Sequence, residues 1–361
     1  MLSSTFPKNS SRFVYSLENL DDFSKIKSSH PSSTFIGTHS GTFHADEVLA
    51  TFLLKFLPEY FNSITIRSRN DKILSQCDIV VDVGSKYDPN SKRFDHHMKD
   101  FFQVFDEKDE KLKEIKLSSA GLVWKHLGKE ILINLLKENN LYEQNENHLD
   151  EILKKIYVNF ICSVDAKDNG INAYPSNIEP KYLDNTSFSA RIARLNPEWN
   201  VENVDVNLRF KMAWDLAEDE FYFQFIHVAN SHFIAYDIVE NSVRKSIENK
   251  NFEYVILDKY CPWKENLIEI EKKYGIENKI KFVILENQNH EFVVNTVPVK
   301  LGSFEFRKGI VKSWRGLRDK ELEEKSGLTG MIFVHVSGFI CFTKSLETAL
   351  KVIEKSLSEK E

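Results

Sequence analysis

In the N-terminal half of the chain, short apolar runs alternate with stretches whose apolar residues recur at helical spacing. Residues 35–37 form an apolar run that ends in glycine, and residues 47–57 keep a helical pattern until Pro58 ends it. Residues 64–67 and 78–83 are further apolar runs, and the second, DIVVDV, has the near-continuous character of a strand buried on both faces. Strands that alternate with helices predict a parallel α/β sheet.

The rest of the chain predicts more helices and a second sheet. Amphipathic patterns indicate helices at residues 118–138 and 149–164. Between Pro197 and Pro262 there is neither glycine nor proline, and residues 207–226 and 232–249 have helix-like patterns. Farther on, apolar runs predict a smaller α/β domain, with strands at residues 254–257, 281–285, 292–297 and 331–336 and a closing helix at 346–357.

These patterns divide the chain into four parts. Residues 1–34 are expected to be a disordered tail or a presequence, because residues 1–17 are rich in serine and no acidic residue precedes Glu18. The other parts are a parallel-sheet domain at 35–200, a helical connector at 201–250 and a smaller C-terminal α/β domain at 251–361.

Composition narrows the classes of function. The 48 basic and 54 acidic residues give a net charge of −6, so nucleic acid could be held only by a local groove and not by overall charge. The four cysteines form no CxxC pair, which argues against a disulfide framework or a thiolate zinc site and favours a reducing compartment. No apolar run approaches the roughly 20 residues of a membrane span. The sequence therefore predicts an intracellular protein outside the membrane, with the cytoplasm, nucleus and mitochondrion all open.

Four segments carry residue types that bind divalent metals. The first, HSGTFHADE, contains His39, His44 and Asp46 and lies between a strand and a helix start, where N–H groups and the strand end face a ligand. The others are Asp82 at the end of the DIVVDV strand, the adjacent Asp95, His96 and His97, and Asp165 after an apolar helix, with Asp168 three residues later. Taken singly, the first segment is also typical of polar residues that cap a helix, and Asp82 is also typical of a residue that caps a turn. The Asp95–His97 segment has neither a helical period nor a strand alternation to explain it.

Together the segments predict a metal site. Asp46, Asp82 and Asp165 would repel one another if they converged without a positive charge, and one or two divalent cations would remove that repulsion. Imidazole and carboxylate ligands without thiolate suit manganese, with magnesium or cobalt as alternatives, better than structural zinc.

The same segments resemble, in order, the four motifs of the DHH phosphoesterase superfamily. Within it they are similar to the MYG (melanocyte proliferating gene) family of metal-dependent exonucleases. The resemblance extends to SARIARLNPEWN, CPWKE, WRGLRD and FVHVSGF, and so covers nearly everything after Phe35. It implies a DHH-type domain with a two-manganese site, a helical connector and a smaller C-terminal domain that closes over the substrate.

The resemblance also implies a role for each motif residue. Asp82 would bridge two metals, one completed by Asp46, His96 and Asp165 and the other by His39 and His44. Asp95 would orient the neighbouring imidazole, and His97 would face the substrate phosphate. Most superfamily members have an aspartate at the position of His44, and the MYG group shares the histidine.

Basic and aromatic residues near the C-terminus are candidates for binding the substrate. Between residues 300 and 320 there are seven basic residues against two acidic ones, and Trp314 lies among them. A solvated basic face explains this segment equally well. The candidates are Arg315, Arg318, His335 and Gly338, with Arg191 from the N-terminal domain and Arg67 and Arg69 as weaker choices. The family tends to continue its GFI with glycines, whereas Cys341, Phe342 and Thr343 follow here, so the approach for the substrate is expected to differ.

The leading hypothesis is a manganese-dependent phosphodiesterase that removes nucleotides from RNA or short oligonucleotides in the 3′ to 5′ direction through two-metal activation of water. A second reading is a pyrophosphatase or small-nucleotide phosphoesterase with a narrower pocket. A third is a metal- or RNA-binding protein without catalysis, which would be expected to have lost motif residues. A homodimer is also considered.

Overall fold

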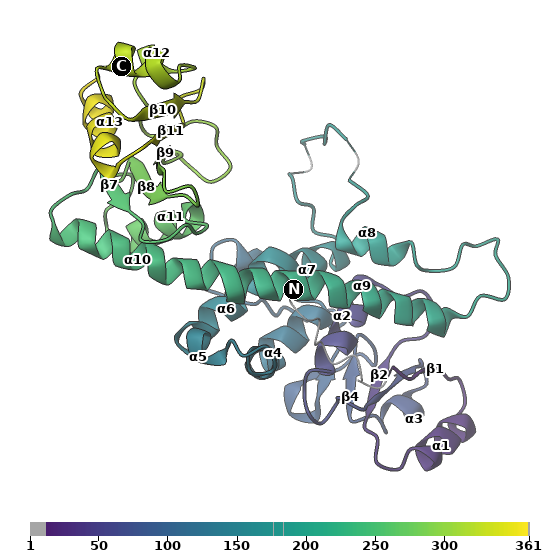
Figure 1. Ribbon diagram of the computed structural model, residues 1–361. Helices are drawn as coiled ribbons and strands as arrows, with labels where there is room; N and C mark the ends of the chain where they lie inside the picture. The colour runs from purple at the N-terminus through teal and green to yellow at the C-terminus, as the bar shows by residue number, and fades with distance from the viewer. Residues whose placement is uncertain (1–11, 176, 183, 360–361) are drawn as a thin grey trace. The chain divides into compact units, whose positions relative to one another are not determined.

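Two units, Met1–Ala229 and Asn230–Glu361, each surround a β-sheet of their own (Figure 1). The computed structural model describes residues 12–359 except residues 176 and 183. Among the helices of these residues, none is both long enough and apolar enough to span a membrane.

The first sheet has six strands in the order β1-β3-β2-β4-β6-β5, and all neighbours except β5 and β6 run parallel. The predicted parallel α/β sheet is therefore confirmed. Because β2, β4 and β6 are neighbours, their carboxyl ends share one edge of the sheet. The strands are β1 (Val14–Ser16), β2 (Phe35–Thr38), β3 (Ile64–Arg67), β4 (Ile79–Val81), β5 (Tyr87–Asp88) and β6 (Arg93–Phe94).

The prediction of a disordered tail is wrong for residues 12–34. Strand β1 pairs in parallel with β3, and the helix α1 (Leu20–Ser29) follows it. Leu17 and Phe23 are buried in the apolar core at this edge, and their burial offsets the entropy lost on ordering the segment. Residues 1–11, on which the presequence hypothesis partly depends, lie outside the described residues.

Helix α2 (Ala45–Leu54) lies at the centre of the first unit, and all ten of its residues are buried. It packs against α4 (Ser119–Glu138) and α9 (Val206–His227), and the indole Nε1 of Trp214 donates to Thr51 Oγ1 at 2.9 Å. A helix buried on every side is held rigidly, which suits the metal ligands predicted at its start. The other helices of the unit include α3 (Asp71–Leu74), α5 (Tyr142–Asn145), α8 (Phe188–Ala193) and the 3₁₀ turns Pro89–Ser91, Leu112–Glu114 and Glu146–His148.

The helix predicted at residues 149–164 is longer than expected and contains a π-helical turn. It consists of α6 (Leu149–Ile156), the π turn Tyr157–Ile161 and α7 (Cys162–Asp168). Such turns insert one extra residue and rotate the side chains that follow. Asp165 therefore lies inside a helix and not after one.

The helices predicted for the connector are present, but each belongs to the core of one unit. Phe210 and Phe221 of α9 are buried in the first unit. Val239 and Val243 of α10 (Phe233–Glu248) are buried in the core of the second. The division between the units falls inside the π turn Val228–His232 and not at residues 200 and 250.

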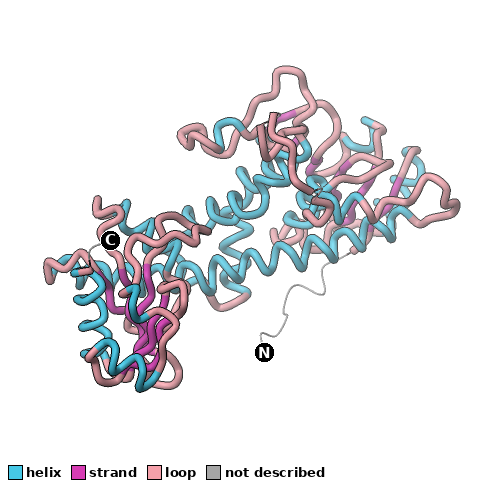
Figure 2. The backbone as a smooth tube through the Cα atoms, turned by 90° about the horizontal axis from the view of Figure 1, so that it is seen from above, coloured by secondary structure: helices cyan, strands magenta, loops and turns pink. Residues whose placement is uncertain are grey.

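The second sheet has five strands in the order β10-β11-β9-β8-β7, antiparallel except for β7 and β8. Side chains of β8 alternate between two apolar cores, so helices cover both faces (Figure 2). The strands are β7 (Tyr254–Ile256), β8 (Phe282–Glu286), β9 (Phe292–Thr296), β10 (Met331–Val334) and β11 (Ile340–Thr343). The helices are α10, α11 (Lys264–Lys273), the 3₁₀ turn Lys312–Trp314, α12 (Asp319–Ser326) and α13 (Leu346–Ser358).

Candidate metal centre

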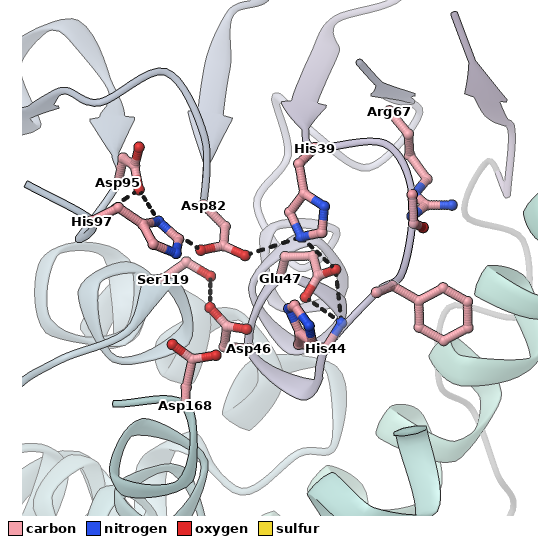
Figure 3. A network of polar contacts seen from close by, with 12 residues as sticks. His39, His44, Asp46, Glu47, Arg67, Asp82, Asp95, His97, Ser119 and Asp168 are labelled. Atoms are coloured by element: carbon pink, nitrogen blue, oxygen red, sulfur yellow. Dashed lines mark hydrogen bonds and ion pairs between the residues drawn. The ribbon is translucent and has the colours of Figure 1, made fainter. Parts of the chain in front are cut away.

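The candidate metal ligands lie at the carboxyl edge of the first sheet, where three adjacent strands end. His39 follows β2, Asp82 lies just after β4, and the segment from Asp95 to His97 follows β6. Figure 3 shows His39, Asp82 and His97 directed toward the same space. Open parallel sheets bind their ligands at this edge, because loops from neighbouring strands converge there.

The loop of residues 39–44 connects β2 to α2 and carries two of the imidazoles. Gly41 has a φ of 95°, which a residue with a side chain rarely adopts. His44 is the N-cap of α2, and its N–H donates to the carboxylate of Glu47 at 2.9 Å. An oxygen of the same carboxylate lies 3.0 Å from His39 Nε2. Glu47 was absent from the predicted site, although a glutamate three residues after an N-cap is typical of a capping box.

Asp82 lies between two imidazoles. Its Oδ2 is 3.3 Å from His39 Nε2, and its Oδ1 is 3.1 Å from His96 Nε2. Its backbone has a φ of 59°, in the left-handed region, where a residue with a side chain is uncommon. A strained conformation of this kind is often kept where it aims a functional side chain. The geometry suits a ligand shared by two cations.

The adjacent residues Asp95, His96 and His97 have different environments. The imidazole of His96 is buried, whereas the side chain of His97 is 60% exposed. Asp95 Oδ1 accepts from His97 Nδ1 at 2.7 Å and from the His96 N–H at 2.8 Å, while its Oδ2 accepts from the Ser85 N–H at 2.6 Å. Asp95 therefore fixes the Nδ1 side of the His97 ring.

Asp46, in the first turn of α2, and Asp168, at the end of α7, complete the cluster. Asp46 Oδ2 accepts from Ser119 Oγ at 2.8 Å (Figure 3). Asp168 Oδ2 lies 3.1 Å from His96 Nε2. Within the described residues, Asp46 Oδ1 and His96 Nδ1 are buried and have no hydrogen-bond partner. Ser119 was not among the predicted site residues, and Asp168 was noted beside Asp165 but was not predicted as a metal ligand.

Asp165, predicted as a metal ligand, does not join the cluster. Its Oδ1 accepts from the N–H groups of Ser118 and Gly121, both at 3.0 Å, and from Ser118 Oγ at 2.6 Å. Its Oδ2 accepts from the hydroxyl of Tyr157 at 2.9 Å. These donors satisfy the carboxylate and point it at the start of α4. Asp168, and not Asp165, lies beside His96 and belongs to one of the groups that could hold a metal ion.

The charges of the cluster are mutually dependent. Burial raises the pKa of Asp46 well above its usual value, and the nearby Asp82 and Asp168 raise it further. Burial opposes protonation of the imidazoles, but hydrogen bonds to carboxylates outweigh it and raise the pKa of His39 to about 10 and that of His96 to about 9. Burial likewise opposes ionisation of Asp82, and its bonds from both imidazoles hold its pKa below the usual range. Protons on the imidazoles thus supply the positive charge that the carboxylates require.

The residues present fit divalent cations. Among the residues that the structure describes, three groups offer ligand atoms within 4.8 Å of one another, and Asp82 belongs to two of them. The unpartnered oxygen of Asp46 points to a missing positive neighbour. Donor atoms of this kind suit manganese or magnesium, and a cation would replace the imidazole protons. The groups are His39, His44, Glu47 and Asp82; Asp82, His96 and His97; and His44, Asp46 and Asp168.

A cavity of about 550 Å³ adjoins the cluster and is lined by His44, His97 and Asp168. Lys116 and Lys167 also line it and place positive charge on its wall. These lysines were not predicted, and no motif contains Lys116. Two arginines proposed for phosphate are engaged elsewhere: Arg191 pairs with Glu220, and Arg67 is fully buried.

The substrate-binding candidates of the second unit lie near one another. Arg315 Nε donates to the Ile310 carbonyl at 2.9 Å, and the arginine side chain lies against Gly338, where a Cβ would approach it within 2.3 Å. The rings of His335 and Phe333 are 6.3 Å apart, and the guanidinium of Arg318 is 5.7 Å from the Phe333 ring. Glycine at 338 therefore leaves the space in which Arg315 lies.

The parallel sheet, the acidic and imidazole cluster at its carboxyl edge and the smaller second domain define an α/β protein with a candidate site for divalent metal ions. The chain belongs to the MYG family: the family model MYG1_exonuc, described as "Uncharacterised protein family (UPF0160)", matches residues 35–357.

Relatives match along most of their length. The "MYG1 exonuclease" of Mus musculus is 42% identical over 328 residues, which cover 90% of this chain and 85% of the relative. The "MYG1 protein" of Dictyostelium discoideum is 40% identical over 332 residues, which cover 91% and 98%. A solved exopolyphosphatase-related protein from Bacteroides fragilis is 12% identical, with a TM-score of 0.21 over 93% of this chain and 95% of that chain, too distant to bear on function.

Proposed function

We propose that this chain is a metal-dependent phosphodiesterase, an exonuclease that removes nucleotides from the 3′ end of RNA or short oligonucleotides with manganese as its cofactor. The observation that carries the proposal is the position of Asp82, whose two oxygens face two different imidazoles within a cluster of carboxylates. The relatives named exonuclease support the choice of reaction.

Each group of the site has a role in this reaction. His39, His44, Asp46, Asp82, His96 and Asp168 would hold two cations, with Glu47 beside them. When bound, such a pair supplies an activated water and stabilises the charge on the attacking and leaving oxygens. In a 3′ to 5′ exonuclease, attack of water on phosphorus breaks the bond to the 3′ oxygen of the preceding nucleotide, which takes up a proton.

The remaining groups bind the phosphate. Asp95 holds the Nδ1 edge of His97, so the opposite edge of the ring is available to a phosphate oxygen in the cavity. Lys116 and Lys167 offset the charge of the substrate from the cavity wall. Arg315 of the second unit is proposed to contact the nucleic acid and to set which substrate is preferred.

The test offers 5′-labelled RNA, 3′-labelled RNA, DNA and pyrophosphate to the purified protein with Mn²⁺. Single nucleotides released from the 3′ end are expected, and Asp82→Ala should abolish both turnover and metal binding. Asp71→Ala, at an exposed aspartate of α3, is the matched control and should behave as the unmodified protein. Phosphate release from pyrophosphate with RNA left intact would instead favour the pyrophosphatase reading. Bound metal without turnover of any substrate would favour a binding protein.

A further inference from the structure

The side chains of Arg67 and Asn196, from elsewhere in the first unit, bind the backbone of the loop of residues 39–44. Arg67 Nη2 donates to the Gly41 carbonyl at 2.6 Å. Asn196 binds both backbone groups of Phe43: its Oδ1 accepts from the Phe43 N–H at 2.9 Å, and its Nδ2 donates to the Phe43 carbonyl at 2.8 Å. The two contacts fall between the imidazoles of His39 and His44.

Asn196 fixes the backbone immediately before the N-cap of α2. It lies just after α8, in the SARIARLNPEWN motif. None of the groups that could hold a metal ion in the described residues includes a residue of this motif. A side-chain amide that satisfies both the N–H and the carbonyl of one residue restrains the position of that residue on both sides. The position of His44 follows, because it is the next residue in the chain.

Arg67 restrains the middle of the same loop. It is the last residue of β3 and is fully buried, with its guanidinium 5.5 Å from the ring of Phe43 and 4.7 Å from the ring of Phe210 in α9. Within the described residues, its Nε and Nη1 have no hydrogen-bond partner. A buried charge with unmatched donors does little for stability, since an apolar side chain of similar size often serves as well or better.

We propose that Arg67 and Asn196 are positioning residues that hold the 39–44 loop in its metal-binding form before the metal arrives. The inference rests on the proposed function, because it assigns them to the same metal site. Holding the loop in advance removes part of the ordering entropy that metal binding would otherwise have to overcome. Side chains that orient metal ligands in this indirect way typically change metal affinity by about 10- to 100-fold when they are removed.

The first test is calorimetric titration of Mn²⁺ into Asn196→Ala. The dissociation constant of this variant for Mn²⁺ is expected to be about tenfold higher than that of the unmodified protein. Asn200→Ala, at an exposed asparagine four residues away, is the control and should leave the dissociation constant unchanged. Asn196→Asp keeps the acceptor for the Phe43 N–H but loses the donor to the Phe43 carbonyl, so its value is expected to lie between the two. At saturating Mn²⁺, turnover by Asn196→Ala should recover while KM for the oligonucleotide stays as in the unmodified protein.

The second test separates positioning from stability. Arg67→Met keeps the length of the buried side chain and removes its charge, so the metal-free protein is expected to unfold at the same temperature as the unmodified protein or higher. Its affinity for Mn²⁺ should nevertheless fall about tenfold. Arg67→Lys retains the charge but not the planar group over the Phe43 ring, and should restore little of that affinity.

The two proposals fail in different ways. If the unmodified protein neither binds Mn²⁺ nor cleaves oligonucleotides, the proposed function is wrong. If it does both, and folded Asn196→Ala and Arg67→Met bind Mn²⁺ as tightly as it does, the positioning role is overturned. A loss of affinity that only accompanies an equal loss of folded protein in both variants would likewise reject it in favour of a structural role.

Discussion

At the scale of single residues, Asp82 shows how a strand end is converted into a ligand site. Strand β4 ends at Val81, and the left-handed backbone of Asp82 turns its side chain toward the imidazoles of His39 and His96. A non-glycine residue in that conformation costs about 1 to 3 kcal/mol. The contacts of both oxygens offset this cost, and a cation would offset it further.

Asp168 and Asp165 can be separated by isosteric replacement. Asp168→Asn is expected to weaken Mn²⁺ binding by at least about tenfold, because a charged oxygen facing His96 is lost. Asp165→Asn should retain the metal, since its oxygen still accepts from Ser118 and Gly121 while its amide faces the Tyr157 hydroxyl. Calorimetric titration measures both, and the reverse order of affinities would restore Asp165 as the ligand.

The raised pKa values of His39 and His96 predict how stability depends on pH without metal. A group whose pKa rises on folding stabilises the protein fully below its ordinary value of 6.5, and that contribution is lost as pH rises to the folded values of about 9 and 10. The metal-free protein should therefore lose stability between pH 7 and 10, and Mn²⁺ should reduce the loss. Thermal unfolding in a chelator checks this; Asp82→Asn, which lacks the facing carboxylate, should show a smaller decline, and an equal one would contradict the explanation.

At the scale of secondary-structure elements, the start of α4 links the buried Asp165 to the metal cluster. Asp165 accepts from N–H groups at the first turn of α4, where the helix dipole favours a negative charge. In that same turn, Ser119 donates to Asp46. The predicted ligand therefore contributes indirectly: it places the helix whose serine orients an actual member of the cluster.

Gly121 leaves no room for a larger side chain between α4 and the carboxylate of Asp165. A Cβ at residue 121 would lie 2.1 Å from Asp165 Oδ2, so Gly121→Ala must displace either α4 or the carboxylate. We expect it to lower the free energy of unfolding by about 1 to 3 kcal/mol, as overpacking of a core does. Glu130→Ala, at an exposed position of the same helix, is the control and should leave stability almost unchanged. Denaturant titration measures both, and equal stability would mean that the carboxylate moves freely.

At the scale of the whole molecule, the candidate metal site and the candidate substrate-binding residues around Arg315 belong to different units. The first contains all three groups that could hold a metal ion in the described part of the chain. The second carries the surface on which Arg315 lies against Gly338. Because these features lie in different units, the substrate contacts proposed for the second unit are expected to be separable from the metal ligands proposed for the first.

This division predicts a selective defect in Arg315→Ala. Loss of a charged hydrogen-bond donor should raise KM for the oligonucleotide by about tenfold. The affinity for Mn²⁺ should stay as in the unmodified protein. Lys325→Ala, at an exposed lysine in the last turn of α12, serves as the control. Kinetics with labelled oligonucleotide and calorimetry with Mn²⁺ decide the matter, and a parallel loss of metal binding would contradict the separation.

Much of the site was predictable because it depends on local pattern. His39 and Asp82 follow apolar runs that form adjacent parallel strands, and such strands bring their carboxyl ends to one edge. The Asp95–His97 segment was identified from its residue types alone, because Arg93 and Phe94 of β6 form no apolar run. The sequence by itself therefore determined two of the strand ends that carry candidate ligands. The fold class follows from the same alternation of strands and helices.

Only the tertiary structure decided the rest. The π turn at Tyr157–Ile161 changes the direction of every later side chain in its helix, so Asp168 faces the cluster and Asp165 faces α4. Asn196 forms hydrogen bonds with the backbone of Phe43, which lies 153 residues earlier in the chain. A periodic pattern specifies which face of an element is buried, but not which distant backbone group a polar side chain will meet, because that depends on how the elements pack.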